Sequence, residues 1–233
     1  MMDIKFNNKT PSDVGGGLAT MPVLTHSEIR QNVQTVPARD GDLYETDMYR
    51  AMASWQMLFH MSSNTLSSDI RAMRQWLSGE GILEIKEGSS SPDSYYEVAQ
   101  VQLTEDFRKS VDYGRINATF YVYPYEFLKS GDTIIEGDGT IENKAEKCKP
   151  LYHIEGSGSG VLTVNDHAMS FTVDSGNLNI DTRRMITYKD DDTSAESAVS
   201  GDYKGLYFEH GDNVVSITNG FDLEITPHWG YYI

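Results

Sequence analysis

The six histidines are the residues with the widest potential for chemistry, because an imidazole can ligate a metal or transfer a proton near neutral pH. They are scattered along the chain at His26, His60, His153, His167, His210 and His228. No pair has the i, i+4 spacing with an intervening glutamate that zinc hydrolases place on one helix face. The sequence therefore predicts structural or surface roles for the histidines and no metal site.

Two further motifs match ligand sites only in part. The run Gly156 to Gly160 is rich in glycine, but it lacks the Lys-Ser/Thr pair and the helix onset that hold a phosphate, so we expect a hairpin loop. Its central residue, Gly158, excludes the G-x-S-x-G elbow of serine hydrolases. Asp190 to Asp192 lack the D-x-D-x-D-G spacing that surrounds calcium. The sequence thus predicts no catalytic residue, no metal, no cofactor and no enzymatic activity.

A cluster of aromatic residues is the remaining candidate for binding. It comprises Phe120, Tyr121, Tyr123, Tyr125 and Phe127. Aromatic faces stack on sugar rings, and aromatic residues are also enriched where proteins meet. Alternation along a strand would bury half of these rings and leave the other half to contact a sugar or another protein. Both interpretations stay open at this point.

The charge of the chain is strongly acidic, with a formal net value of -16. Residues 1–129 hold 12 Lys and Arg against 17 Asp and Glu, a net charge of -5, whereas residues 130–233 hold 7 against 18, a net charge of -11. Such a surface repels phosphate backbones, so nucleic acid is not an expected partner, and it also favours solubility. The single cysteine, Cys148, excludes an intrachain disulfide.

No membrane segment is expected from the sequence. The N-terminal residues show no basic stretch followed by an apolar run, so we expect no signal peptide. The densest apolar stretch, Ala51 to Met61, is interrupted by Gln56 and His60 and is too short to span a bilayer.

The first part of the chain mixes extended and ambiguous patterns. We expect the segment around Gly15-Gly16-Gly17 to be flexible unless a partner or a neighbouring strand captures it. Glu28 to Val36 is interpreted as a strand, although its apolar spacing is poor for either period, and Pro37 with Asp40-Gly41 predicts a tight turn after it. Asp47 to Met61 fits a helical stripe and a strand alternation equally well.

A helix and three strands are predicted next. Asp69 to Leu77 is amphipathic and is followed by Gly79 as a stop signal. Ile82 to Ile85 and Tyr95 to Leu103 are interpreted as strands. The clearest alternation of the chain runs from Arg115 to Tyr123, and we expect Pro124 to end that strand because proline lacks an amide hydrogen. These elements predict an antiparallel sheet covered by one helix.

Short apolar runs separated by turn signals recur in the last part of the chain. They are Leu151 to Ile154, Val161 to Val164, Met169 to Val173, Leu178 to Ile180, Met185 to Tyr188, Leu206 to Phe208, Val214 to Ile217 and Leu223 to Ile225. Such spacing is typical of an all-β sandwich. The predicted fold class is therefore mainly β (α+β), with a sheet domain and one helix over residues 1–129, a linker or short connecting strand over 130–149, and a β-sandwich over 150–233.

The order of several weak motifs resembles the distal tail protein (Dit) family of long, non-contractile-tailed bacteriophages. Members show a Pro-Gly-Arg-Asp-Gly-like turn, a strand, a helix ending in Trp-Leu, a Tyr-containing hairpin and a strand closing on an aromatic-Pro pair. The corresponding segments here are Pro37 to Gly41, the run to Met61, Asp69 to Leu77, Tyr95 to Leu103 and Phe120 to Pro124. Later segments follow the family's order too, notably Leu178 to Thr182 and Ile225 to Trp229. One departure is Ala38, which stands where glycine is common.

The resemblance implies a structural hub of a phage tail tip. Its first domain would form a hexameric ring that joins the tail tube to the baseplate or adsorption apparatus, and a galectin-like β-sandwich would project outward. The implied partners are further copies of the chain, the tail-tube protein, tail-associated or adsorption proteins and the tape measure protein. The implied location is the virion tail tip, after assembly in the cytoplasm of the bacterial host. The resemblance also makes Asp47 to Met61 a strand.

A closed ring needs head-to-tail interfaces, and sheet edges with exposed aromatic residues can supply them. The candidate interface residues are Arg39, Asp40, Gly41, Trp55, Tyr121 and Tyr123. The alternative function is a carbohydrate-binding β-sandwich module that uses exposed tyrosines.

Overall fold

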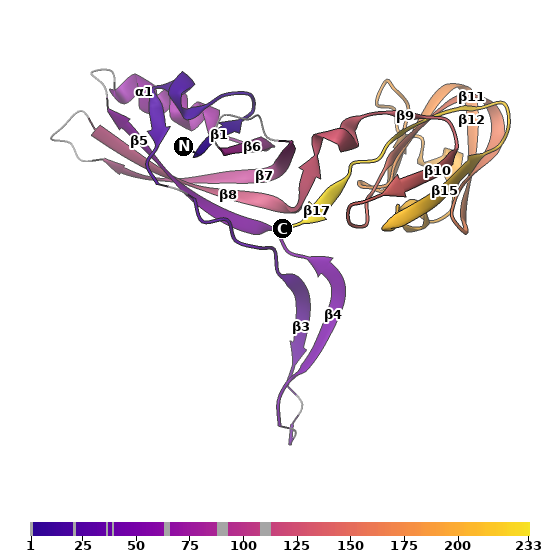
Figure 1. Cartoon of the computed structure of the whole chain (residues 1–233), viewed down its shortest axis with the longest axis horizontal. Coiled ribbons are helices and arrows are strands. Elements are labelled where there is room, and N and C mark those ends of the chain that lie inside the picture. Colours follow the sequence, from indigo (N-terminus) through magenta and orange to yellow (C-terminus); the bar gives the residue numbers. More distant parts are fainter. Residues whose placement is uncertain are drawn as a thin grey trace. The chain divides into compact units, whose positions relative to one another are not determined.

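The structure is a computed structural model that describes residues 2–20, 22–35, 37–38, 40–62, 66–87, 93–107 and 113–233. Strands predominate, and the described residues contain one α-helix, α1 (Leu66–Trp76). The chain divides into two compact units, the first comprising Met1–Glu126 with Tyr232–Ile233 and the second Phe127–Tyr231 (Figure 1). The expected mainly-β class with one helix is confirmed. Among the described residues, no helix is long and apolar enough to cross a membrane.

The first unit is built on one antiparallel sheet. Its strand order is β1-β6-β7-β8-β5-β2, and β17 also pairs with β8. The bounds are β1 (Met2–Phe6), β2 (Gly16–Leu18), β5 (Ala53–Ser62), β6 (Gly81–Glu87), β7 (Ser94–Phe107), β8 (Tyr113–Leu128) and β17 (Gly230–Tyr232). Helix α1 covers one face of this sheet (Figure 1). Two more strands, β3 (Ile29–Gln34) and β4 (Leu43–Arg50), form a separate two-stranded sheet.

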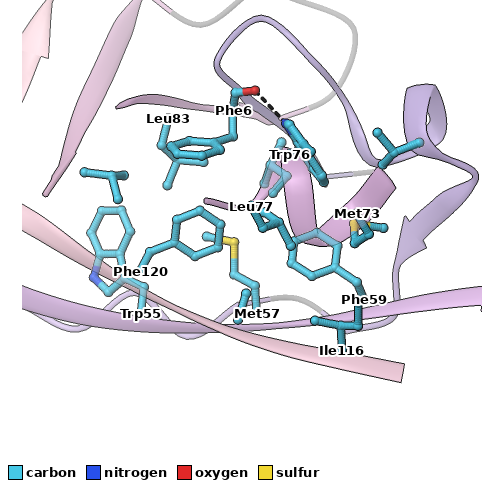
Figure 2. Close-up of a cluster of buried hydrophobic side chains, with 14 of the residues drawn as sticks. Phe6, Trp55, Met57, Phe59, Met73, Trp76, Leu77, Leu83, Ile116 and Phe120 are labelled. Atoms are coloured by element: carbon cyan, nitrogen blue, oxygen red, sulfur yellow. Dashed lines mark hydrogen bonds between the residues drawn. The ribbon is translucent and has the colours of Figure 1, made fainter. Parts of the chain in front are cut away.

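The core of the first unit lies between α1 and the covered face of the sheet (Figure 2). Trp55 and Phe59 point into it from β5, and Phe120 points into it from β8, because alternate residues of a strand face the same side. Edge-to-face packing joins Phe6 to Phe120, with ring centroids 5.5 Å apart. The buried Trp76 indole donates to the carbonyl of Phe6 at 2.7 Å, which attaches α1 to β1.

The N-terminal segment is captured by neighbouring strands. β1 pairs with β6 over its whole length, and β2 pairs with β5. Glycine is needed here because a Cβ on Gly16 would lie 2.4 Å from the Met73 methyl group, and one on Gly17 would lie 2.7 Å from the His60 ring. The triple glycine therefore allows close packing of β2 and is not a flexible linker.

The expectation that Pro124 ends its strand is wrong, since β8 continues through Pro124 to Leu128. Pairing with β5 stops at Val122, opposite Ala53, so no partner on that side requires an amide from Pro124. The carbonyl of Pro124 accepts instead from the backbone amide of Ile233 at 3.3 Å. A proline is tolerated in a strand at a position where no neighbouring carbonyl would pair with the amide hydrogen that it lacks.

The second unit is organised by one long hairpin, β11 (Leu151–Val164) and β12 (His167–Asp181). The N-terminal half of β11 also pairs with β16 (Asp222–Thr226), and its C-terminal half pairs with β15 (Gly211–Ile217). The remaining strands extend these two halves. They are β9 (Ile135–Glu136), β10 (Gly139–Asn143), β13 (Ile186–Tyr188) and β14 (Val199–Ser200). Side chains from both halves contribute to one hydrophobic cluster.

Three expectations for this unit are wrong. Gly156 to Gly160 is not a hairpin loop but part of β11, with a bulge between Gly156 and Gly158. The break expected between the runs Met169 to Val173 and Leu178 to Ile180 is also absent, because β12 continues through both. Leu206 to Phe208 is not a strand, because a short 3-10 helix spans Tyr203–Leu206.

Residues 130–149, expected to be a linker or a short connecting strand, contain β9 and β10. β9 pairs with β16, and β10 pairs with β15, so this stretch belongs to the sheet of the second unit. The polar, glycine-containing sequence was misleading because both strands are short, and only Ile141 and Asn143 of β10 are buried.

Candidate assembly surface

The β3–β4 hairpin has no sheet neighbour among the described strands. Every residue of β3 is exposed. An isolated two-stranded hairpin is marginally stable in water, because it has no core to cover either face. This hairpin is therefore the element of the chain that most needs a partner.

The hairpin is anchored at its base. The Ala51 amide donates to the Glu28 carbonyl at 2.7 Å, and the Arg50 guanidinium donates to the Ser27 carbonyl at 3.2 Å. Arg50 also lies over the ring of Tyr232, 4.5 Å from its centroid, and the Ser27 amide donates to the carbonyl of Ile233 at 2.8 Å. These contacts fix where the hairpin leaves the first unit.

Exposed hydrophobic residues concentrate on and beside this hairpin. Among the described residues, fifteen large hydrophobic residues are exposed, and eight of them lie between residues 23 and 52. They are Val23, Leu24, Ile29, Val33, Leu43, Tyr44, Tyr49 and Met52. A gathering of this kind marks a protein–protein contact surface more often than scattered single residues do.

The register shows how these side chains are distributed. Val33 lies opposite Tyr44, so the two share one face of the hairpin. Leu43, next to Tyr44 along β4, lies on the other face, opposite Gln34. Val33 is 50% exposed and Tyr44 is 62% exposed. Both faces thus carry apolar groups, which suits a segment that inserts between other surfaces.

The predicted interface residues lie in different environments. Asp40 and Gly41 lie in the segment that joins β3 to β4, and Gly41 has a left-handed φ of 81°. Arg39 lies outside the described residues. Tyr121 and Tyr123 lie on the face of β8 that points away from the core. Tyr123 is 38% exposed, and the hydroxyl of Tyr121 donates to Gln102 at 3.0 Å.

Trp55 is placed in the core. It is 1% exposed, its indole donates to the carbonyl of Thr25 at 2.8 Å, and its ring packs edge-to-face on Tyr96 at 4.8 Å. A neighbouring copy cannot contact a side chain that its own unit covers. We therefore treat Trp55 as a core residue and not as part of the assembly surface.

Residues of the hairpin itself were missed as a contact surface. The segment Glu28 to Val36, which contains Val33, was interpreted only as a strand. The signal was the poor spacing of Glu28 to Val36 for either period, because a strand exposed on both sides has no face on which to concentrate its apolar residues.

Burial shifts the pKa of two ionisable side chains in the second unit, Cys148 and His228. Burial raises the pKa of the Cys148 thiol to about 11, which keeps it protonated and unreactive. Burial lowers the pKa of His228, and the nearby Arg183 charge acts in the same direction. Within the described part of the chain, no group of three or more His, Cys, Asp or Glu side chains could hold a metal ion.

The similarity of this chain to known proteins was found by comparing structures and not by comparing sequences. No family model matches the sequence, and no curated protein matches it. The solved structure of SPP1 Dit, described as a paradigm of the hub adsorption apparatus in phages that infect Gram-positive bacteria, aligns with a TM-score of 0.70. The alignment covers 97% of this chain and 98% of that chain at 10% sequence identity. The chain has the fold of a phage Dit hub protein.

Two structures of the activated phage P2 baseplate, with Ca and with Sr, give a weaker likeness. Their TM-scores are 0.51 and 0.50 at 11% and 10% identity, and they cover 97% and 96% of this chain and 97% and 98% of the matched chains. The Dit likeness drawn from motif order is thus confirmed for the fold, over both units.

Proposed function

We propose that this chain is a structural hub of a bacteriophage tail tip, with no enzymatic role. The observation that carries the proposal is the likeness to the SPP1 Dit hub protein over 97% of the chain. Both units are included in that likeness. A hub that connects other proteins needs contact surfaces and no reaction centre.

The assembly that we propose is a hexameric ring formed by the first unit. The support for self-association is the β3–β4 hairpin, which is anchored at its base and carries exposed Val33 and Tyr44 beyond it. A segment that fits a different surface on the next copy makes a head-to-tail contact, and such contacts close into a ring when the rotation allows it. Asp40, Gly41, Tyr121 and Tyr123 remain proposed members of the interface.

The second unit would project from the ring as a galectin-like β-sandwich. We propose that the ring joins the tail tube to the baseplate or adsorption apparatus. Its partners would be the tail-tube protein, tail-associated or adsorption proteins and the tape measure protein. The location would be the virion tail tip, following assembly in the host cytoplasm. The proposed ring-forming domain corresponds to the first unit and the proposed sandwich to the second unit, which includes the paired strands β9 and β10.

The test is the mass of the purified full chain by light scattering, with negative-stain images of the same sample. We expect a mass six times that of the 26.1 kDa chain and ring-shaped particles. Val33→Asp with Tyr44→Asp should reduce the mass to that of one chain and leave the melting temperature of the monomer unchanged, because both side chains are exposed within the chain.

A matched control is Val214→Asp, which places a charge on an exposed residue of the second unit. This variant should still form rings. The proposal is wrong if the wild-type chain stays monomeric at high concentration, shows no rings, and forms none with tail-tube protein present. If Asp40→Ala changes neither assembly nor stability, Asp40 does not belong to the interface.

A further inference from the structure

The second unit contains a polar pocket of about 330 Å³. Small-molecule sites commonly range from about 300 to 1,000 Å³, so its size suits a small ligand. The pocket is lined by the β11–β12 turn at Asn165 and Asp166, by His167, and by the segment from Asp202 to Gly205. Its remaining lining comes from three residues of neighbouring loops, Lys147, Tyr207 and Glu209.

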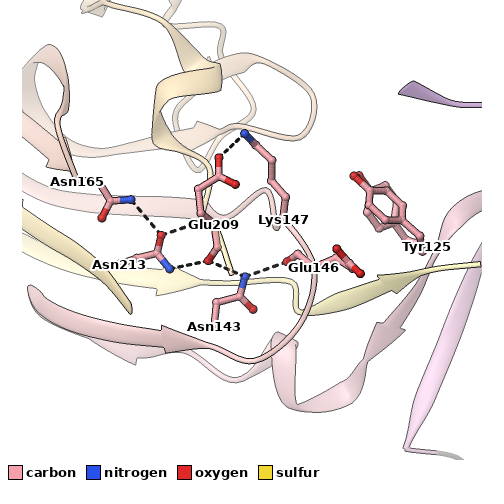
Figure 3. A network of polar contacts seen from close by, with 8 residues as sticks. Tyr125, Asn143, Glu146, Lys147, Asn165, Glu209 and Asn213 are labelled. Carbon is pink, nitrogen blue, oxygen red and sulfur yellow. Dashed lines mark hydrogen bonds and ion pairs between the residues drawn. The ribbon is translucent and has the colours of Figure 1, made fainter. Parts of the chain in front are cut away.

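A network of asparagine side chains contacts two of the lining residues, Asn165 and Glu209 (Figure 3). The side chain of Asn213, which is fully buried, accepts from the Asn165 side chain at 3.1 Å and from the Glu209 amide at 2.9 Å. It also donates to the Glu209 carbonyl at 2.8 Å. The buried Asn143 donates to the same carbonyl at 3.1 Å. The Asn165 side chain and the Glu209 backbone are thus held in place by contacts within the second unit.

Another part of the lining depends on a close approach between the backbone of Gly205 and the side chain of His167. A Cβ on Gly205 would lie 2.8 Å from the Cβ of His167, so glycine lets His167 pack against this segment. Asp202 accepts from the Lys204 amide at 3.0 Å, which fixes the segment that carries the Lys204 side chain.

The chemistry of the lining selects the class of ligand. Asp166, Asp202 and Glu209 provide carboxylates, and Lys147 and Lys204 provide ammonium groups, with Lys147 and Glu209 forming an ion pair. The carboxylates outnumber the ammonium groups by one, which disfavours anions. Apolar ligands are disfavoured as well, because the lining contains no aliphatic side chain and its one tyrosine, Tyr207, is only 6% exposed.

A neutral molecule with several adjacent hydroxyl groups fits this lining best, because each hydroxyl can donate to a carboxylate and accept from an ammonium group. We propose that this pocket of the second unit binds a sugar of one or two rings. The site uses charged groups and the side chain of Asn165, and none of the aromatic residues between 120 and 127 line it. The proposal is independent of the hub function.

Saturation-transfer NMR on the full chain tests this proposal with four probes: glucose, N-acetylglucosamine, glycerol 3-phosphate and glycine. We expect transfer to at least one of the two sugars. Asp166→Asn combined with Lys204→Gln should weaken that binding by about tenfold or more, since hydrogen bonds to charged groups are replaced by weaker ones. The matched control, Asp222→Asn with Lys189→Gln, makes the same charge changes outside the pocket and should leave binding unchanged.

Thermal melts of both double variants separate lost binding from lost folding, because the exchanged side chains should leave the melting temperature unchanged. The proposal is overturned if neither sugar receives transfer, if both double variants lose binding equally, or if only glycerol 3-phosphate or glycine binds. Ring assembly should be the same in all these variants, so a failure here is distinguishable from a failure of the hub proposal.

Discussion

Two hairpins of this chain, β3–β4 and β11–β12, differ in what covers them. In β11, alternate residues are fully buried, among them Tyr152, Ile154, Leu162 and Val164, and the strand has further neighbours in β15 and β16. In β3, every residue is exposed, and the hairpin pairs with no other described strand. Other strands of the same chain thus extend the β11–β12 hairpin into a larger sheet, whereas no described strand does so for the β3–β4 hairpin.

The burial pattern along each strand reflects this difference. Within each half of β11 every second residue is buried, so one side belongs to a core. β3 has no preferred side, and its apolar residues have solvent around them in a single chain. A chain that retains exposed apolar residues on an anchored hairpin is suited to assembly with another surface.

The largest expected effect comes from exchanging one aromatic residue in each hairpin for alanine. Phe171 in β12 is 2% exposed and packs on Phe221 with ring centroids 4.9 Å apart. Phe171→Ala should lower the free energy of unfolding of the second unit by about 3–5 kcal/mol through lost burial and a cavity. Tyr44→Ala should change the stability of the monomer by less than about 0.5 kcal/mol.

Urea unfolding at a concentration where the chain is monomeric measures both variants. The order of the two effects should be reversed for ring formation, which Tyr44→Ala should weaken more than Phe171→Ala does. A large loss of monomer stability in Tyr44→Ala would contradict the comparison, because it would mean that the chain itself covers this hairpin.

Most elements of the fold were predictable where the local signals agreed. The helix before Gly79 and the strands near Ile82 and Tyr95 lie within a few residues of their predicted bounds, and the strand from Arg115 was recognised by its clear alternation, although it continues past Pro124 to Leu128. Asp47 to Met61 was ambiguous by pattern, and only the family resemblance favoured extended structure. The structure confirms strands there, β4 and β5, with a break at Ala51 and Met52.

The long strands of the second unit could not be predicted from local signals. Glycine usually marks a turn, but Gly160 lies within β11. It is glycine because the rings of Phe171 and Phe221 occupy the space that a side chain would fill. That contact joins residues far apart in sequence. No window that contains only Gly156 to Gly160 includes the aromatic partners, so tertiary packing determined the outcome.

A substitution at Gly160 measures that packing directly. A Cβ there would lie 2.5 Å from the Phe171 ring and 2.9 Å from the Phe221 ring, closer than packed atoms approach. Gly160→Ala should therefore destabilise the second unit by about 1–3 kcal/mol in urea unfolding. Ser159→Ala, at an exposed neighbouring position, should have little effect. Equal stability of Gly160→Ala and the wild type would show that the rings move aside freely.

The polar face of β11 makes stability depend on pH. Burial alone would lower the pKa of His153, but bonds to Asn179 at 2.8 Å and Glu155 at 3.2 Å, with the charge of Asp190, raise it. Because the pKa is higher in the folded state, this contribution to stability is full below the usual histidine pKa of 6.5 and is lost as pH rises through the raised pKa.

Urea midpoints of the wild type and His153→Gln, measured from about pH 5 to about pH 8, test this dependence. The stability advantage of the wild type should be greatest at the acidic end and should shrink as pH rises. Asp174→Asn, on an exposed residue of β12 outside this cluster, serves as the control for changes in surface charge. An advantage that stays constant or grows with pH would contradict the assignment.

Of the candidate site, the position of the turn was predictable, because the turn motif indicated Asp40 and Gly41 and the hairpin places both residues between its two strands. Their membership of the interface stays a prediction. The burial of Trp55 could not be foreseen, because an aromatic residue in an ambiguous segment gives no indication of which face will be covered. The exposure of Val33 had a local sign in the poor spacing of Glu28 to Val36, whereas the exposure of Tyr44 follows from the lack of a covering element among the described strands.

The smallest expected effect concerns the turns of the two hairpins. Asn165 in the β11–β12 turn has a left-handed φ of 52°, which asparagine tolerates, whereas Ala38 in the β3–β4 turn has a φ of 64°. Glycine at this position removes the clash of the alanine Cβ but adds freedom to the unfolded chain, so Ala38→Gly should stabilise the hairpin by at most about 1 kcal/mol. Hydrogen exchange at the amides of Val33 and Tyr44 should slow by up to about fivefold. Ala51→Gly, at a residue without a left-handed φ, should not slow it, and faster exchange in Ala38→Gly would show that the turn is not strained.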